Sequence, residues 1–221
     1  MHTIGVLLSG CGNRDGSEIH EATLTLAAID RLGHAAVCIA PHKQQAWVFN
    51  HFEKAPSRAE QRNVIFEAAR IARGEIREMS TVSMDELDAL ILPGGQGAIR
   101  NLTDFAEAGT ACGIDPQVER LLKEALAQRK PIGALCVAPV VVARAFRGAP
   151  GVRIKLTIGT DPETARAIEA FGAIHEPRGA REICVDVTYR IVSTPCYMLA
   201  KRISEVEEGV NRLVDEIVAM I

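Results

Sequence analysis

The sequence predicts an α/β fold in which a three-layer, doubly wound, mostly parallel sheet is covered by helices on both faces. Short apolar runs alternate with longer amphipathic stretches along the whole chain. These runs are continuously apolar, which is typical of strands buried on both faces. The chain has 221 residues and shows no internal repeat or linker, so we expect a single domain over residues 1–221.

The first half of the chain begins with a strand over 3–9 and a glycine-rich loop over 10–16. A helix follows, with Asp15 or Ser17 as its cap and Gly33 at its end. Its apolar face is Ile19, Ala22, Leu26 and Ile29. A strand over 35–40, an irregular segment over 41–57, a helix over 59–72 and a strand over 85–92 complete this half.

The second half is predicted to alternate in the same way. Helices are expected over 116–128, 138–146 and 162–171, and strands over 131–135 and 155–158, with 183–187 and 190–194 as a hairpin or two strands. A last helix carries apolar residues at steps of three and four, namely Leu199, Ile203, Val206, Val210, Leu213, Ile217 and Met220. This stripe spans few heptads, so we expect packing on its own domain rather than a coiled coil.

Composition excludes several classes of partner. The chain has 25 Lys and Arg against 28 Asp and Glu, with one Trp, two Tyr and six Phe, which disfavours binding of nucleic acid. The longest uncharged apolar run, 131–143, is too short to cross a membrane, and the apolar run 4–8 is too short for the core of a signal peptide. We therefore expect no membrane partner and a cytoplasmic protein. Six scattered cysteines without a C-x-x-C pair predict free thiols and no metal site.

Two glycine-rich loops follow predicted strands, where ligands bind in doubly wound folds. The first loop, Gly10 to Gly16, has the spacing G-x-G-x-x-x-G, and no acidic residue ends the next strand, so the pattern for a dinucleotide site is weak. The second loop contains Gly94 and Gly95, whose backbone N–H groups can approach a ligand closely.

A third loop contains the strongest candidate for a nucleophile. The sequence Ala134-Leu135-Cys136-Val137-Ala138 joins an apolar strand to a helix, with small residues two before and two after the cysteine. This is the pattern of a nucleophile elbow, and a thiol at a helix N-terminus is expected to ionise more readily. The alternative is a small thiol packed in the core. Glu18 and Glu21 open the first helix and are candidate partners, or surface acids that compensate the helix dipole.

These residues occur within motifs that span nearly the whole chain. They are IGVLLSGCG (4–12), DGSEIHEATLTL (15–26), RNVIFEAARIARGEI (62–76), LDALILPGGQGAIRNL (87–102), LTIGTD (156–161) and TPCYMLA (194–200), together with the elbow. The chain thereby resembles the ElbB-type glyoxalases, also called enhancing-lycopene-biosynthesis or isoprenoid-biosynthesis proteins. They form part of the PfpI/ThiJ branch of the class I glutamine amidotransferase-like superfamily, which has a flavodoxin-like fold.

The resemblance implies a role for each matching residue. Cys136 would be the nucleophile and Glu21 the acid that hydrogen-bonds its thiol. The N–H groups of Gly95 and Val137 would hold an oxyanion, with Gly94 beside them and Glu18 as a nearby acid. It also implies a homodimer, no metal or other cofactor, and a small reactive dicarbonyl substrate, which is converted to a 2-hydroxy acid.

The sequence departs from the amidotransferases at the triad histidine. Val137 follows the cysteine, the loop about twenty residues later contains no histidine, and His175 lies on a different connection. His20 is expected to point away from the site. Glutamine hydrolysis is therefore disfavoured and slow glyoxalase turnover is expected. The alternative function is a cysteine-based redox or regulatory protein that affects isoprenoid biosynthesis.

Overall fold

The computed structural model describes residues 1–221 and contains a seven-stranded sheet in the order β10-β11-β7-β6-β1-β2-β5. All neighbouring strands are parallel except β10, which pairs antiparallel with β11. The strands of this sheet are β1 (Thr3–Leu7), β2 (Ala35–Ala40), β5 (Ile76–Glu78), β6 (Ala89–Leu92), β7 (Ile132–Leu135), β10 (Cys184–Asp186) and β11 (Ile191–Thr194). The predicted α/β class is confirmed.

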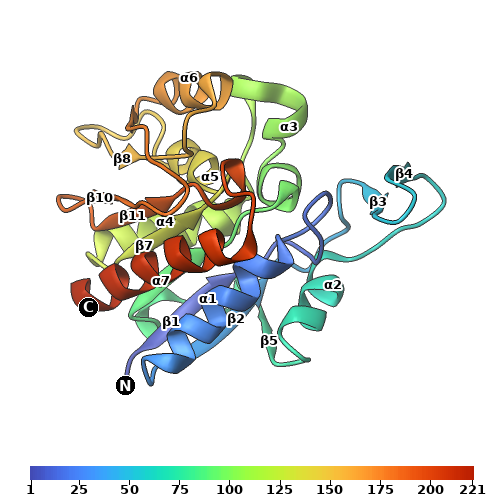
Figure 1. Ribbon diagram of the computed structural model, residues 1–221, viewed down its shortest axis with the longest axis horizontal. Helices are drawn as coiled ribbons and strands as arrows, with labels where there is room; N and C mark the ends of the chain where they lie inside the picture. The colour runs from blue at the N-terminus through green and yellow to red at the C-terminus, as the bar shows by residue number, and fades with distance from the viewer.

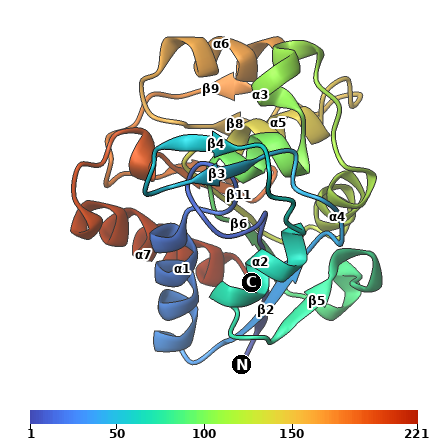
Figure 2. The same ribbon diagram turned by 90° about the vertical axis from the view of Figure 1, so that its right-hand side faces the viewer.

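Helices cover both faces of the sheet (Figures 1 and 2). They are α1 (Ile19–Arg31), α2 (Val64–Ile71), α3 (Phe105–Ala108), α4 (Pro116–Ala127), α5 (Pro139–Ala145), α6 (Pro162–Ala170) and α7 (Ile203–Met220). Helices α1 and α7 pack side by side on one face, and α4 and α5 lie on the other. The central strands β1, β6 and β7 are therefore buried on both faces, which explains their continuous hydrophobicity. No helix combines the length and the apolar character that crossing a bilayer requires.

Helix α1 begins later than the sequence predicts. Its N-cap is Glu18, whose carboxylate accepts a hydrogen bond from the N–H of Glu21. The two predicted caps are engaged elsewhere: Ser17 Oγ accepts from the N–H of Ser9, and Asp15 accepts from the N–H of Phe49. Ile19, expected on the apolar face, is 44% exposed because it lies at the first position of the helix, on the rim of the site.

The segment predicted to be irregular contains a small hairpin of β3 (Val48–Asn50) and β4 (Ala55–Ser57), which projects from the body of the molecule. A second small sheet joins β8 (Lys155–Leu156) to β9 (Ile174–His175). Helix α2 begins at Val64 rather than near residue 59, because Asn63 caps it. The edge strand β5 was not predicted, since three half-buried residues leave no pattern in the sequence.

Helix α7 confirms the expectation that the last amphipathic stripe packs on its own domain. Val206, Val210, Leu213 and Ile217 are fully buried against α1 and the sheet. Leu199 was predicted to begin this stripe but precedes the helix, in the turn after β11, and Ile203 is half exposed. The helix is thus shorter than its apolar pattern.

The sheet order determines which loops meet at the carboxyl ends of the strands. Strand β6 lies between β1 and β7, so the loop after β6 lies between the loop that leads to α1 and the loop that leads to α5. These three loops contain Glu21 at the start of α1, Gly94 and Gly95 after β6, and Cys136 after β7. The topology thereby brings residues from three distant parts of the chain to one edge of the sheet.

Candidate active site

Cys136 occupies a sharp turn between β7 and α5. Its backbone φ is 57°, a left-handed conformation that is strained for a residue with a side chain. Strand β7 ends at Leu135 and α5 begins at Pro139, which suits a first helical position. The residue is 7% exposed. This is the strand-to-helix geometry of a nucleophile elbow, as the sequence pattern predicts.

Glu21 lies in the first turn of α1 and is completely buried. Its Oε2 accepts a hydrogen bond of 2.9 Å from the N–H of Gly94, and its Oε1 accepts one of 3.4 Å from the N–H of Tyr197. A buried carboxyl group requires such partners, because it has lost its hydration. The two backbone donors fix the carboxyl group at the edge of the sheet.

Gly94 separates Glu21 from Cys136 and allows them to approach each other. A Cβ atom on Gly94 would lie 2.4 Å from the Cβ of Cys136 and 2.7 Å from Oε2 of Glu21. No side chain fits there, so the two groups flank the same glycine. Gly94 was expected to bind substrate, but its N–H is already bound to Glu21 and its carbonyl accepts from the N–H of Glu18. It supports the site rather than offering a free donor.

Glu18 lies close to this pair, as the sequence predicts. Its carboxylate caps α1 by accepting a hydrogen bond of 2.8 Å from the N–H of Glu21. The neighbouring Gly95 has a φ of +92°, and a Cβ on it would lie 2.4 Å from the backbone nitrogen of Glu18. Glycine is therefore required at position 95 both for its conformation and for this close approach.

Burial dominates the electrostatics of the two acids. It raises the pKa of Glu21 to about 8, and the negative charge of Glu18 adds to the rise, while the N–H groups of Tyr197 and Gly94 and the Cys136 thiol oppose it. Burial, followed by the charge of Glu21, also raises the pKa of the Cys136 thiol. The two groups therefore titrate as a pair, which loses its first proton near pH 8.

The expectation of an acidic thiol at a helix N-terminus is thus wrong for the free protein. The loss of hydration at a buried sulfur outweighs the stabilisation that the helix end supplies. The N–H groups of Gly95 and Val137 interact with the sulfur and lower the pKa of Cys136, though not enough to reverse the rise. These two amides lie where the sequence predicts an oxyanion site.

Two residues at the site were not predicted. Tyr197 donates its backbone N–H to Glu21, and its hydroxyl lies 2.7 Å from Nδ1 of His20, so His20 contacts a neighbour of the site. Cys196 is fully buried with a φ of 45°, and the N–H of Cys136 interacts with its sulfur. Both come from the turn after β11, within the motif TPCYMLA (194–200), to whose residues the sequence analysis assigned no role. His175 binds the N–H of Ile158 and supplies no third member of a triad.

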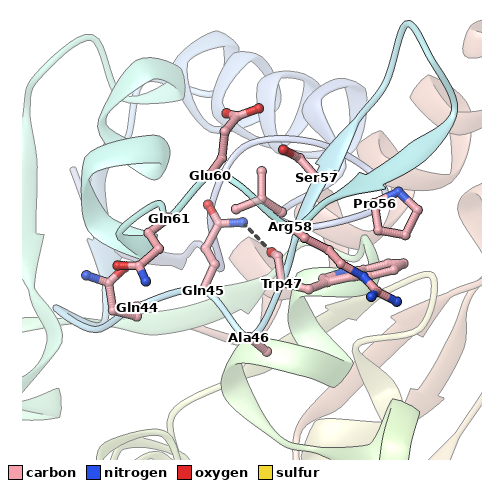
Figure 3. Close-up of a pocket in the computed structure, with 10 residues that line it drawn as sticks. Gln44, Gln45, Ala46, Trp47, Pro56, Ser57, Arg58, Glu60 and Gln61 are labelled. Atoms are coloured by element: carbon pink, nitrogen blue, oxygen red, sulfur yellow. Dashed lines mark hydrogen bonds between the residues drawn. The ribbon is translucent and has the colours of Figure 1, made fainter.

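A cleft of about 640 Å³ has a lining that includes neither residue of this pair. Its lining, drawn in Figure 3, comes from residues 44–48, 56–58, 60 and 61, including Trp47 and Arg58. A smaller cleft of about 270 Å³ adjoins the site, because Glu18 and His20 line it together with Cys11 and His51. No group of three or more His, Cys, Asp or Glu side chains is arranged to hold a metal ion.

Comparison with known proteins places these observations in a family. No family model matches the chain. It is 38% identical over 98% of its length to the ES1 protein homolog, mitochondrial, of Rattus norvegicus, covering 83% of that protein. It is also 38% identical to the glutamine amidotransferase-like class 1 domain-containing protein 3, mitochondrial, of Homo sapiens, with 98% of this chain and 82% of that protein covered.

Solved structures of similar proteins share the fold of this chain. The crystal structure of an isoprenoid biosynthesis protein with an amidotransferase-like domain from Ehrlichia chaffeensis matches with a TM-score of 0.92 and 32% identity, over 99% of this chain and all of that one. A ThiJ/PfpI domain protein from Brachyspira murdochii, 12% identical over 98% of this chain and 96% of that one, has a TM-score of 0.59 and shares the fold. The predicted superfamily is confirmed.

One expectation is overturned by the same comparisons. The sequence was interpreted as that of a cytoplasmic protein, but the relatives found in rat, human and zebrafish are all named as mitochondrial proteins. The absence of a recognisable signal peptide does not determine the cellular compartment of a protein. The sequence identity, the length of the match and the shared fold together show that the chain belongs to the family of ES1 and glutamine amidotransferase-like class 1 domain proteins.

Proposed function

We propose that the protein is a cofactor-independent, glyoxalase-like enzyme that converts glyoxal or methylglyoxal to a 2-hydroxy acid through Cys136. The observation that carries the proposal is the buried pair of Cys136 and Glu21 on either side of Gly94. A thiol beside a carboxyl group can add to an aldehyde and then move protons without a metal or an organic cofactor. Membership of the superfamily supports a functional cysteine at this site and does not specify its reaction.

In the first step the sulfur of Cys136 attacks an aldehyde carbon. The new S–C bond forms as the electron pair of the C=O bond moves to oxygen, and the thiol proton passes to the carboxylate of Glu21. The N–H groups of Gly95 and Val137 stabilise the developing oxyanion, which takes the proton back from Glu21 to give a hemithioacetal and restore the carboxylate.

In the second step Glu21 moves a proton between adjacent carbons. Its carboxylate removes the proton from the carbon bonded to sulfur, the electron pair forms a C=C bond, and the oxygen of the neighbouring carbonyl takes the proton to give an enediol. The hydroxyl proton next to sulfur then passes through Glu21 to the neighbouring carbon as that C–O bond becomes the thioester C=O bond, which gives a 2-hydroxy thioester. Water then cleaves the thioester, releases the 2-hydroxy acid and restores the thiol. Because one carboxyl group serves every transfer, we expect turnover to be slow.

Glyoxal consumption without glutathione tests the proposal. We expect the purified protein to form glycolate catalytically, and Cys136→Ala and Glu21→Gln each to lower the rate by roughly 100-fold or more. Cys38→Ala, which removes a buried thiol on β2 away from the site, is the matched control and should retain the rate. Equal rates in wild type and Cys136→Ala would contradict the proposal.

A cysteine-based regulatory protein of isoprenoid biosynthesis is the second candidate. The observation in its favour is the solved relative named as an isoprenoid biosynthesis protein, together with a cysteine that lies on a strained turn beside a carboxyl group. This candidate predicts negligible glycolate formation, and modification of Cys136 by oxidants, in the same preparations.

A further inference from the structure

We propose that Cys196 is a resolving thiol for Cys136, so that a hydroperoxide converts the two residues to an intramolecular disulfide. The site would then undergo reversible two-electron oxidation in addition to any reaction with carbonyl compounds. The inference rests on the position of a second buried cysteine and not on the proposed glyoxalase activity.

The strand register brings the two cysteines close to each other. Strands β7 and β11 are adjacent and parallel (Figure 1), and Leu135 is paired with Thr194 in their register. The N–H of Cys136 continues the ladder by donating to the carbonyl of Thr194. Continued by one residue, the register puts Cys136 opposite Pro195 and next to Cys196. With strands about 4.8 Å apart and a rise of about 3.3 Å, an offset of one residue separates Cα atoms by roughly 6 Å. Disulfides span roughly 4.4–6.8 Å.

The backbone turns in the same unusual way at both cysteines. Cys136 has a φ of 57° and Cys196 a φ of 45°, whereas the other four cysteines are absent from the residues with positive φ. Cys136 directly follows the end of β7, and Cys196 follows the end of β11 after one residue, so the two segments leave the sheet at nearly the same level. The N–H of Cys136 also interacts with the sulfur of Cys196, which brings that sulfur to the base of the elbow.

Burial keeps both thiols neutral in the reduced site. It is the main cause that raises the pKa of Cys136 and of Cys196, and the negative charge of Glu21 adds to the rise at each sulfur. A disulfide replaces the two thiols by a group without an ionisable proton, so the oxidised site is compatible with the burial of both sulfurs.

The reaction balances with a hydroperoxide as the oxidant. The thiolate of Cys136 attacks the outer oxygen of the peroxide, the O–O bond breaks, and an alcohol or water leaves, so that Cys136 becomes a sulfenic acid. Cys196 then attacks that sulfur, hydroxide leaves as water with the thiol proton of Cys196, and the S–S bond forms. The peroxide is reduced by two electrons and the pair of thiols is oxidised by two.

Peptide mapping of the full-length protein after treatment with hydrogen peroxide tests the proposal. In wild type we expect the main product to be a peptide pair that joins Cys136 to Cys196, has lost two hydrogen atoms and separates on treatment with dithiothreitol. In Cys196→Ser the linked pair is lost, and Cys136 accumulates as sulfenic acid that dimedone traps, followed by sulfinic acid. Cys184→Ala, which removes another buried thiol on β10, should give the same linked pair as wild type.

Two results would overturn the proposal. One is oxidation of Cys136 to sulfinic acid in wild type without any linked pair, since Cys196 would then not resolve the sulfenic acid. The other is an absence of oxidation at Cys136 while peroxide modifies other cysteines. The wild-type mapping decides both even if Cys196→Ser does not fold. Glyoxal turnover is scored separately, so that failure of the disulfide and failure of the enzyme are distinguished.

Discussion

The arrangement of Cys136 and Glu21 depends on a residue that has no side chain. Gly94 fills the space between them with a backbone only, and its N–H holds the carboxyl group in place. Neither residue could reach its observed position if a methyl group occupied that space. The geometry of the pair is therefore set as much by residue 94 as by the two acids.

Gly94→Ala should lower glyoxal turnover by roughly 100-fold, because a displacement of about 1 Å at a reacting group has this effect. The added methyl group would displace Cys136, Glu21 or both. Gly113→Ala is the control, since its Cβ would meet only Oδ1 of Asp104, at 3.7 Å, and should leave turnover unchanged. Turnover in Gly94→Ala equal to that of wild type would show that the close approach does not matter.

Sequence analysis chose Cys136 as a nucleophile from a local pattern, whereas the roles of Glu21, Gly95 and Val137 were expected from the family resemblance. Small residues on both sides of a cysteine after an apolar strand predict a tight turn, and paired glutamates predict a helix start. Tyr197 was missed and the role of Cys196 was left open, because their position depends on β11 lying beside β7, which a local pattern does not reveal. The raised pKa of the thiol was missed for a similar reason: burial is a tertiary property.

At the scale of elements, helix α7 packs on the part of the sheet that contains β7 and β11. Its buried face packs against both strands and against α1, the helix that contains Glu21. The strong apolar period made this helix predictable, whereas the short strands β3, β4 and β5 left too few residues for any period to appear.

Leu213→Ala should lower the free energy of unfolding by about 2–5 kcal/mol, because it leaves a cavity between α7 and the sheet. Leu213 is fully buried, and its Cδ2 would lie 2.9 Å from a Cβ on Gly133 of β7. Ile203→Ala on the same helix removes a half-exposed side chain and should cost less than about 1 kcal/mol. Urea denaturation of both variants measures the difference, and equal losses would contradict this packing.

At the scale of the whole molecule, the buried acid links stability to pH. Glu21 has its pKa raised from 4.5 to about 8 on folding, so the folded state keeps a proton that the unfolded chain releases. The stabilisation is fully present below pH 4.5 and is lost as pH rises through about 8. A group placed for chemistry thus makes the fold less stable at the alkaline end of this range.

Glu21→Gln should remove this dependence. The free energy of unfolding of the variant, relative to that of wild type, should increase by roughly 1–4 kcal/mol as pH rises from acid values to the alkaline side of the Glu21 pKa. This change is expected whatever the difference in stability at acid pH. Urea denaturation across that pH range measures the change. Parallel stability profiles for wild type and variant would mean that Glu21 is not held protonated by burial.

The homodimer implied by the sequence resemblance remains a prediction about the whole molecule. Sedimentation of the purified protein should give twice the mass of the 23.9 kDa chain over a range of concentrations. A mass of one chain throughout that range would contradict it.

The pairing of Cys136 with Glu21 is tested most directly by alkylation of Cys136 with iodoacetamide as a function of pH, followed by peptide mass spectrometry. In wild type the rate should rise only at pH values above the ordinary pKa of a thiol, because burial and the negative charge of Glu21 raise the pKa of Cys136. In Glu21→Gln this charge is absent, so the pKa of the thiol should fall and the rise should move to lower pH. The same profile in wild type and Glu21→Gln would contradict the account, because Cys136 would then titrate independently of Glu21.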